Sequence, residues 1–200
     1  MDFSTPFPYL GLSHSILLIS ERRKITLLIC RVRIIVNEYE TALFNSTIED
    51  ILSQRIKNAI ELRSFHGIPQ QDYTTVYRLI NSEGDFFSGL TADVFNNIVV
   101  IQSSAYWTER HKDMILSCFQ KAMPSDFEFI WKQSSSFLQQ DGFYPPTAVD
   151  APTADSAAIC VFENGIQFSV NPGKGQKTGF YCDQRDNRRI IRSMCRGNIA

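Results

Sequence analysis

The sequence has few histidines and no closely spaced cysteines. Its three histidines lie far apart, and its five cysteines include no Cys-x-x-Cys pair. Zinc sites and disulfide frameworks need such side chains at short, regular spacing. The chain also lacks an apolar run of the roughly 18 residues that a membrane span requires. We therefore expect no metal site, no membrane partner and a reducing compartment.

The sequence also lacks an excess of either charge. Twenty Lys and Arg against 21 Asp and Glu give a formal net charge of -1, so any binding to nucleic acid must come from local patches. Each of two basic patches fits either a solvated face or a surface that contacts phosphates. The first patch spans 21–24 with Arg31 and Arg33, and the second comprises Arg185, Arg188, Arg189, Arg192 and Arg196.

The N-terminal region lacks the order of features that a secretion signal has. The apolar segment 13–20 is short, and the basic residues 22–24 follow it rather than precede it. Two hundred residues with 44% hydrophobic content can bury a core of one or two domains. We expect a globular protein that is not secreted and that resides in the cytoplasm or in an organelle, a plastid or mitochondrion.

Hydrophobic periodicity predicts an α+β fold. After an irregular first segment of 28 residues, 28–36 alternates like a half-buried strand, and 46–65 has helical spacing with a capping box of Ser46 and Glu49. Residues 145–156 are predicted to form a surface loop. Further strands are expected at 75–80, 90–95, 98–102, 127–132, 160–163 and 166–170, and helices at 107–122 and 134–140, with Asn164-Gly165 as a hairpin turn.

The densest chemistry lies at 175–189, GQKTGFYCDQRDNRR. Asp183 is expected to cap a helix over 184–196, whose narrow apolar stripe comprises Ile190, Ile191 and Met194. The segment 177–181 offers a cation, a hydroxyl, a flexible backbone and two rings, which suits a nucleotide or a ligand with a carboxylate and a ring system. It is not a phosphate-binding P-loop, because the glycine required before Lys-Thr is missing.

Four separated motifs carry a family resemblance. They are YRLINSEGD at 77–85, SGLTAD at 88–93, ENG at 163–165 and the stretch at 175–189. Their order and spacing, within a match from about 29 to 197, resemble the S-adenosylmethionine-dependent ribosomal RNA large-subunit cytosine-C5 methyltransferases, particularly plant-like members.

The resemblance implies a PUA-type RNA-binding barrel, a long helix, an α+β middle domain with an antiparallel sheet, and a Rossmann-like catalytic domain that binds S-adenosylmethionine. The chain is expected to be truncated at both ends relative to this plan. The implied parts are an irregular N-terminus and partial PUA-like remnant at 1–40, the linking helix at 41–69, the middle domain at 70–172 and the start of the catalytic domain at 173–200.

The resemblance also implies candidate site residues. The family's nucleophilic cysteine lies downstream of position 200, so no catalytic residue is expected here and Cys182 is interpreted as a packing residue. Glu83 and Asp85 are either an acidic pair bordering the active site or a solvated turn. The candidates for the cofactor and target base are Lys177, Thr178, Gly179, Phe180, Asp183 and Arg185. Those for RNA phosphates, unless they form a salt-bridged helix face, are Arg188, Arg189 and Arg192.

Two functions of different class remain open. The first is an RNA methyltransferase by descent, whose activity needs a catalytic domain from outside these 200 residues. The second is a non-catalytic module that binds RNA or a full-length paralogue through the arginine-rich helix and the α+β domain. Ribosomal RNA is the expected partner, and exposed hydrophobic surface would favour self-association.

Overall fold

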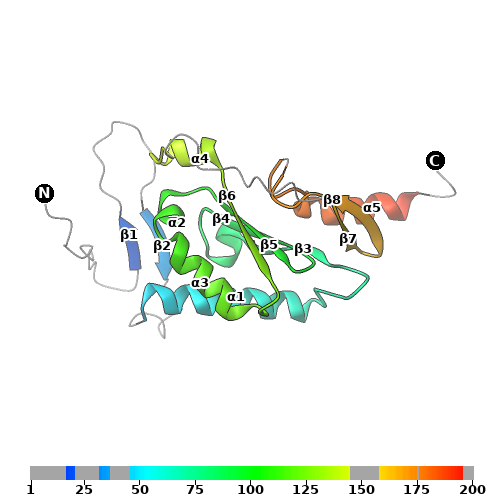
Figure 1. The fold of residues 1–200 in the computed structure, drawn as a ribbon, viewed down its shortest axis with the longest axis horizontal. Helices are drawn as coiled ribbons and strands as arrows, with labels where there is room; N and C mark the ends of the chain where they lie inside the picture. Colours follow the sequence, from blue (N-terminus) through cyan, green and yellow to red (C-terminus); the bar gives the residue numbers. More distant parts are fainter. Residues whose placement is uncertain (1–16, 21–31, 37–45, 145–157, 175, 196–200) are drawn as a thin grey trace, which may run out of the picture.

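The computed structural model describes residues 17–20, 32–36, 46–144, 158–174 and 176–195, and it confirms the α+β fold. Figure 1 shows a central sheet with long helices along one side and a hairpin and helix at the C-terminal end. The helices are α1 (Ile48–Phe65), α2 (Tyr106–Arg110), α3 (Lys112–Ala122), α4 (Ser135–Gln140) and α5 (Arg185–Met194), with 3-10 turns η2 (Ser82–Asp85) and η3 (Cys182–Gln184). The strands are β1 (Leu17–Ser20), β2 (Val32–Val36), β3 (Val76–Asn81), β4 (Leu90–Phe95), β5 (Ile98–Ser103), β6 (Glu128–Gln133), β7 (Ile159–Glu163) and β8 (Ile166–Val170).

The main sheet has the strand order β3-β4-β5-β6. The first three strands pair antiparallel, as expected, whereas β6 pairs parallel to β5. The crossover from β5 to β6 runs through α2 and α3, which is the connection that a parallel pair requires. The sheet is therefore mixed.

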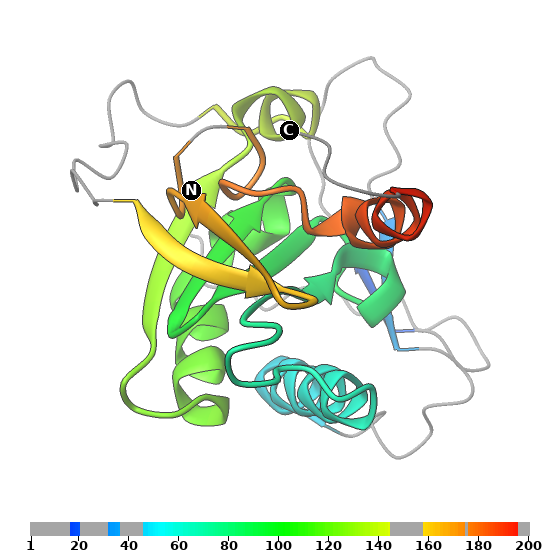
Figure 2. The same ribbon diagram turned by 90° about the vertical axis from the view of Figure 1, so that its right-hand side faces the viewer.

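Both faces of this sheet are covered. One face packs on α1 and α3 through a core that includes Leu52, Leu79, Ile101 and Phe119. The other face packs on the β7–β8 hairpin through Val100, Val161 and their neighbours, and Figure 2 shows this hairpin crossing the sheet. Two separate cores thus share one sheet, and the second core joins the hairpin and η3 to the rest of the molecule.

The cap of α1 differs from the prediction by one residue. Thr47 and Asp50 form the capping box, instead of Ser46 and Glu49. Glu49 pairs with Lys121 of α3 at 2.7 Å instead. The helix itself ends at Phe65, as predicted.

Three further element predictions need correction. The expected helix at 107–122 is two helices that meet at His111. The first 28 residues are not wholly irregular, because Leu17–Ser20 forms β1 and pairs antiparallel with β2. The helix predicted to run to about Arg196 ends at Met194, and Cys195 is its extended C-cap. Two expectations lie outside the described residues: the loop at 145–156 and the strand residues 28–31. The first basic patch, except for the backbone of Arg33 in β2, and Arg196 of the second patch lie outside them as well.

Within the described ranges, no helix has both the length and the apolar character needed to cross a membrane.

Candidate ligand-binding site

The loop before α5 is fastened to the sheet through a buried carboxylate. Asp93 of β4 is fully buried, and Thr178 Oγ1 donates to its Oδ2 at 2.6 Å. Arg78 of β3 donates to the same carboxylate from Nε at 2.8 Å and from Nη2 at 3.0 Å. The hydrogen bonds to Asp93 raise the pKa of Arg78. Thr178, which is predicted to border a ligand, is fully buried and anchors its own loop.

Lys177 lies on the exposed side of the same loop. Its Nζ is 2.5 Å from Asp183 Oδ2 and 4.9 Å from the centre of the Tyr181 ring. The hydrogen bond from Lys177 lowers the pKa of Asp183, which is therefore ionised at neutral pH. Asp183 does not cap α5 as predicted: Gln184 occupies the N-cap position without a side-chain hydrogen bond.

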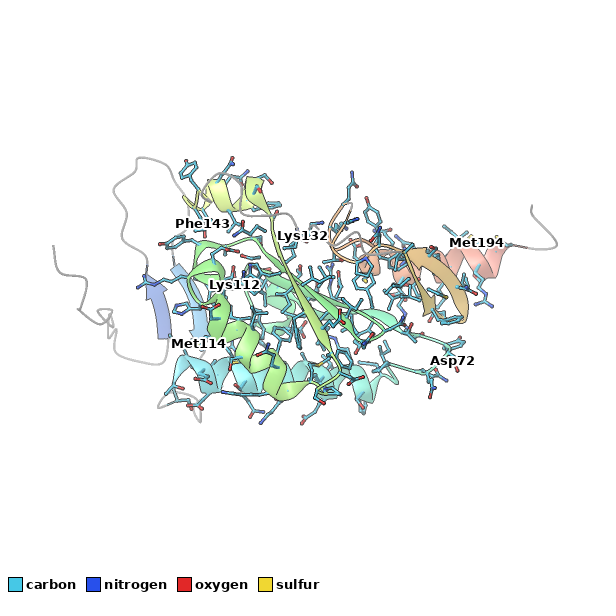
Figure 3. All side chains as sticks on the ribbon, in the orientation of Figure 1. Asp72, Lys112, Met114, Lys132, Phe143 and Met194 are labelled. Atoms are coloured by element: carbon cyan, nitrogen blue, oxygen red, sulfur yellow. The ribbon has the colours of Figure 1, made fainter. Side chains whose placement is uncertain are left out.

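Gly179 and Phe180 serve the packing of the loop. Gly179 has a φ of +114°, and a Cβ on it would lie 2.4 Å from the carbonyl oxygen of Asn171. Phe180 packs against Phe168 of β8 with ring centres 5.1 Å apart. On the opposite flank, Lys132 of β6, labelled in Figure 3, donates to the carbonyl of Lys177. These contacts pack the loop against β6, β8 and the backbone at Asn171.

Helix α5 rests on the hairpin through its arginines. Arg188 donates to both carboxylate oxygens of Glu163, at 2.6 and 2.7 Å, and its guanidinium lies 4.6 Å from the Phe180 ring centre. Arg185 and Arg192 donate to Asn164 in the hairpin turn, at 3.0 and 2.6 Å. Arg188 is predicted either to contact RNA phosphates or to belong to a salt-bridged helix face. Its pair with the buried Glu163 corresponds to the salt-bridged face.

The outer side of α5 has a different character. Arg189 is 68% exposed, and its Nε lies 3.6 Å from an Asp186 carboxylate that is itself 84% exposed, so this pair contributes little. Ile190, Ile191 and Met194 are also exposed, and Figure 3 marks Met194 near the end of the helix. The apolar stripe predicted for α5 therefore faces outward from the described part of the chain.

A pocket of about 510 Å³ lies where α1, β3 and η2 meet the start of α5. Of the six residues predicted to bind the cofactor, Asp183 and Arg185 line it, whereas Lys177, Thr178, Gly179 and Phe180 do not. The predicted set is thus divided between a structural loop and a cavity. Cys182 also lines the pocket and is buried. Burial raises the pKa of its thiol, as expected for a packing residue.

An ion pair that the sequence did not reveal forms one wall of this pocket. Arg63 of α1 donates to Asp85 from Nη1 at 2.6 Å and from Nη2 at 2.7 Å. Asp85 also accepts from the backbone N–H of Asn81 at 2.6 Å. Asp85 is therefore not part of a solvated turn, and it borders a cavity, while its neighbour Glu83 accepts from the Ser88 hydroxyl at 2.8 Å.

Sequence reasoning also missed Arg78 and Asp93. Both are charged residues inside otherwise apolar strands, and a charge in such a position must be paired when it is buried. That signal was present in the strand pattern, but it does not identify the partners. Among the described residues, no group of three or more His, Cys, Asp or Glu could hold a metal ion.

No protein-family model matches the chain. The ribosomal RNA large subunit methyltransferase I of Alteromonas mediterranea is 35% identical over 138 residues, which are 68% of this chain and 33% of that protein. The protein of the same name from Pseudoalteromonas translucida is 31% identical over 144 residues, 72% of this chain and 35% of that protein. The chain is homologous to part of these methyltransferases. It spans about a third of their length.

Solved structures share the fold. A SAM-dependent methyltransferase candidate from Streptococcus mutans superposes with a TM-score of 0.56 at 22% identity, covering 73% of this chain and 36% of that one. A second methyltransferase candidate, solved in complex with SAH, gives a TM-score of 0.56 at 23% identity with the same coverage. At these identities the likeness shows that the chain shares the fold of the matched part of each structure.

Proposed function

We propose that this chain is the RNA-docking part of an S-adenosylmethionine-dependent ribosomal RNA methyltransferase. The observation that carries the proposal is the 35% identity over 138 residues to a ribosomal RNA large subunit methyltransferase I. Cytosine C5 as the target atom and the plant-like subgroup remain predictions from the four motifs. A location in the cytoplasm or an organelle remains a prediction from the cysteine usage and the N-terminal sequence.

In this proposal the described elements have separate tasks. α1 is the linking helix, β3 to β8 form the middle domain, and the loop and α5 at 173–195 lead into a cofactor-binding domain. The strands β1 and β2 are the candidate for the PUA-like remnant. The hydrogen bond from Thr178 to Asp93 joins the loop before α5 to β4 of the middle domain.

The internal contacts of the loop argue against cofactor binding by this chain alone. Thr178 is committed to Asp93, and Gly179 is pressed against Asn171. A cofactor site needs several polar groups that converge on one cavity, and only Asp183 and Arg185 of the predicted set do so. A non-catalytic module that binds RNA or a full-length paralogue is the second candidate function, and self-association through exposed hydrophobic surface remains a prediction.

The experiment measures binding of the chain to a fragment of large-subunit ribosomal RNA across a salt series. For single-stranded RNA, each phosphate contact makes the slope of log affinity against log salt more negative by about 0.7. Arg189→Ala should weaken binding and flatten that slope. Lys57→Ala is the control, because it removes an exposed cation from the middle of α1. RNA that does not bind at all would contradict the proposal.

A parallel calorimetric titration with S-adenosylmethionine tests whether this chain holds the cofactor by itself. RNA binding without any heat from S-adenosylmethionine is the result expected here, because the proposal places the cofactor-binding domain outside these 200 residues. Saturable heat would contradict that placement and would favour an active methyltransferase.

A further inference from the structure

The pocket between α1 and α5 is formed mostly by elements other than the loop that precedes α5. Its walls come from the last turns of α1, from β3 and η2, and from the start of α5. Figure 1 shows that these elements come from distant parts of the chain. Its volume of about 510 Å³ lies within the range of small-molecule sites, roughly 300 to 1,000 Å³.

Part of the pocket lining is apolar. Leu62 and Ile68 contribute to it, together with Tyr77 and the buried Cys182. Tyr77 is buried as well, and burial moves the pKa of its phenol still further above physiological pH. An uncharged lining of this kind favours burial of an uncharged ring over burial of an ion.

The polar groups of the pocket are balanced in charge. Guanidinium groups come from Arg63, Arg78 and Arg185, and carboxylates come from Asp85, Asp183 and Asp186, with His66 at the edge. A bare phosphate would meet three carboxylates, and a metal ion would meet three guanidiniums, so neither is a good match. The edge of a nucleobase carries both donors and acceptors, and it can use both kinds of group.

The rim adds a surface for stacking. Phe65, next to His66 in the chain, is 85% exposed, and its ring lies edge to face with the His66 ring at 5.5 Å. Exposed aromatic side chains are a usual platform for unpaired bases. Arg189, on the outer side of α5, is available for the backbone of the same strand.

We propose that this pocket binds one unpaired nucleobase of a single-stranded RNA segment, with Phe65 stacking on a neighbouring base. The proposal rests on the proposed function, because it assumes that the chain docks RNA. It adds to that function a site that selects unpaired nucleotides. A paired base could not enter, since its edge is covered and its ring is stacked in the helix.

The test uses the whole chain and a fluorescein-labelled ten-residue oligoribonucleotide, either single-stranded or annealed to its complement. Leu62→Glu places a carboxylate in the pocket wall at a position that is 47% exposed, so the fold should tolerate it. Phe137→Glu on α4, 59% exposed and outside the pocket lining, is the matched control. Phe65→Ala is a second variant that tests the rim without altering the pocket.

The proposal expects wild-type protein to prefer the single strand, and Leu62→Glu and Phe65→Ala each to weaken that binding on the order of tenfold, about the contribution of one bound base. Phe137→Glu should bind like wild type. A 4-thiouridine oligonucleotide should crosslink within 62–68 or 182–186.

RNA binding that is unchanged in both pocket variants, or that crosslinks elsewhere, overturns the base site and leaves the proposed function standing. Equal affinity for single strand and duplex overturns it as well. If S-adenosylmethionine displaces the oligonucleotide from wild type, the pocket belongs to the cofactor. If wild type binds no RNA, the proposed function fails together with this site.

Discussion

Asp93 of β4 accepts a 2.6 Å hydrogen bond from the hydroxyl of Thr178, a residue 85 positions later in the chain. The same carboxylate holds the guanidinium of Arg78 on the neighbouring strand. One buried group therefore joins two strands of the sheet to the loop that precedes α5. Loss of this group should affect the sheet and the loop together.

Removal of the carboxylate should be costly. Asp93→Ala leaves Arg78, whose side chain is only 19% exposed, without its partner, and breaking such a pair costs about 3 to 5 kcal/mol of unfolding free energy. Thr178→Val should cost less, about 1.5 to 3 kcal/mol, because it removes one hydrogen bond to a charged group. Urea unfolding of both variants measures the difference. A smaller loss for Asp93→Ala than for Thr178→Val would contradict this account.

Gly179 should tolerate no side chain. A Cβ at this position would lie 2.4 Å from a backbone oxygen, at a φ of +114°, so Gly179→Ala must displace the loop and should lower the melting temperature clearly. Gly142→Ala is the control, since Gly142 also has positive φ, at +81°, but its Cβ would meet no atom within 4 Å. The control should lose only about 1 kcal/mol from backbone strain. Equal losses would show that contact with Asn171 is unimportant.

The ion pair of Glu163 and Arg188 should hold α5 on the hairpin. Glu163→Gln removes the charge from a carboxylate that is only 3% exposed, so amide hydrogen exchange in α5 should accelerate on the order of tenfold, while exchange in β4 stays unchanged. Asp186→Asn is the control, because its pair with Arg189 is largely exposed. If Asp186→Asn accelerates amide exchange in α5 by the same factor, the effect comes from net charge alone.

Tyr77 predicts a loss of stability at high pH. Burial raises its pKa from 10.0 to about 12 in the folded protein, so between these values the unfolded chain releases the phenolic proton while the folded chain keeps it. The stabilising contribution is fully present below pH 10 and is lost as the pH rises toward 12. Over that interval wild type should lose roughly 2 to 3 kcal/mol more than Tyr77→Phe. Parallel curves for the two proteins in urea unfolding would refute the assignment.

Local patterns were enough to predict most of the elements. The strands at 90–95 and 166–170 have the predicted bounds, because alternation and the Asn-Gly turn are both encoded within a few residues. The cap of α1 was placed one residue early because two overlapping pairs, Ser46 with Glu49 and Thr47 with Asp50, satisfy the same local rule. Lys121 of α3 lies where it can pair with Glu49, and no local rule includes that contact.

Pairings between distant residues could not be predicted in this way. The parallel pairing of β6 with β5, the pair of Arg63 with Asp85 and the bond of Thr178 to Asp93 each depend on the folded arrangement. For the same reason, the motif at 175–189 indicated the correct region but not which of its residues face a cavity. A charged residue within an apolar strand remains the one local sign that such pairings exist.

The burial of both faces of the central sheet limits which sequences can replace this one. An ordinary half-exposed strand accepts polar residues at every second position, but five of the six residues of β4 are buried, and Val99 to Ile101 of β5 are buried in succession. A library of all single substitutions should therefore show a continuous band of intolerance from Ala92 to Phe95 of β4 and across the middle of β5. At Asp93 the preference should be reversed. Apolar residues should be rejected at this one position in the middle of the strand, whereas polar residues are rejected at its buried neighbours.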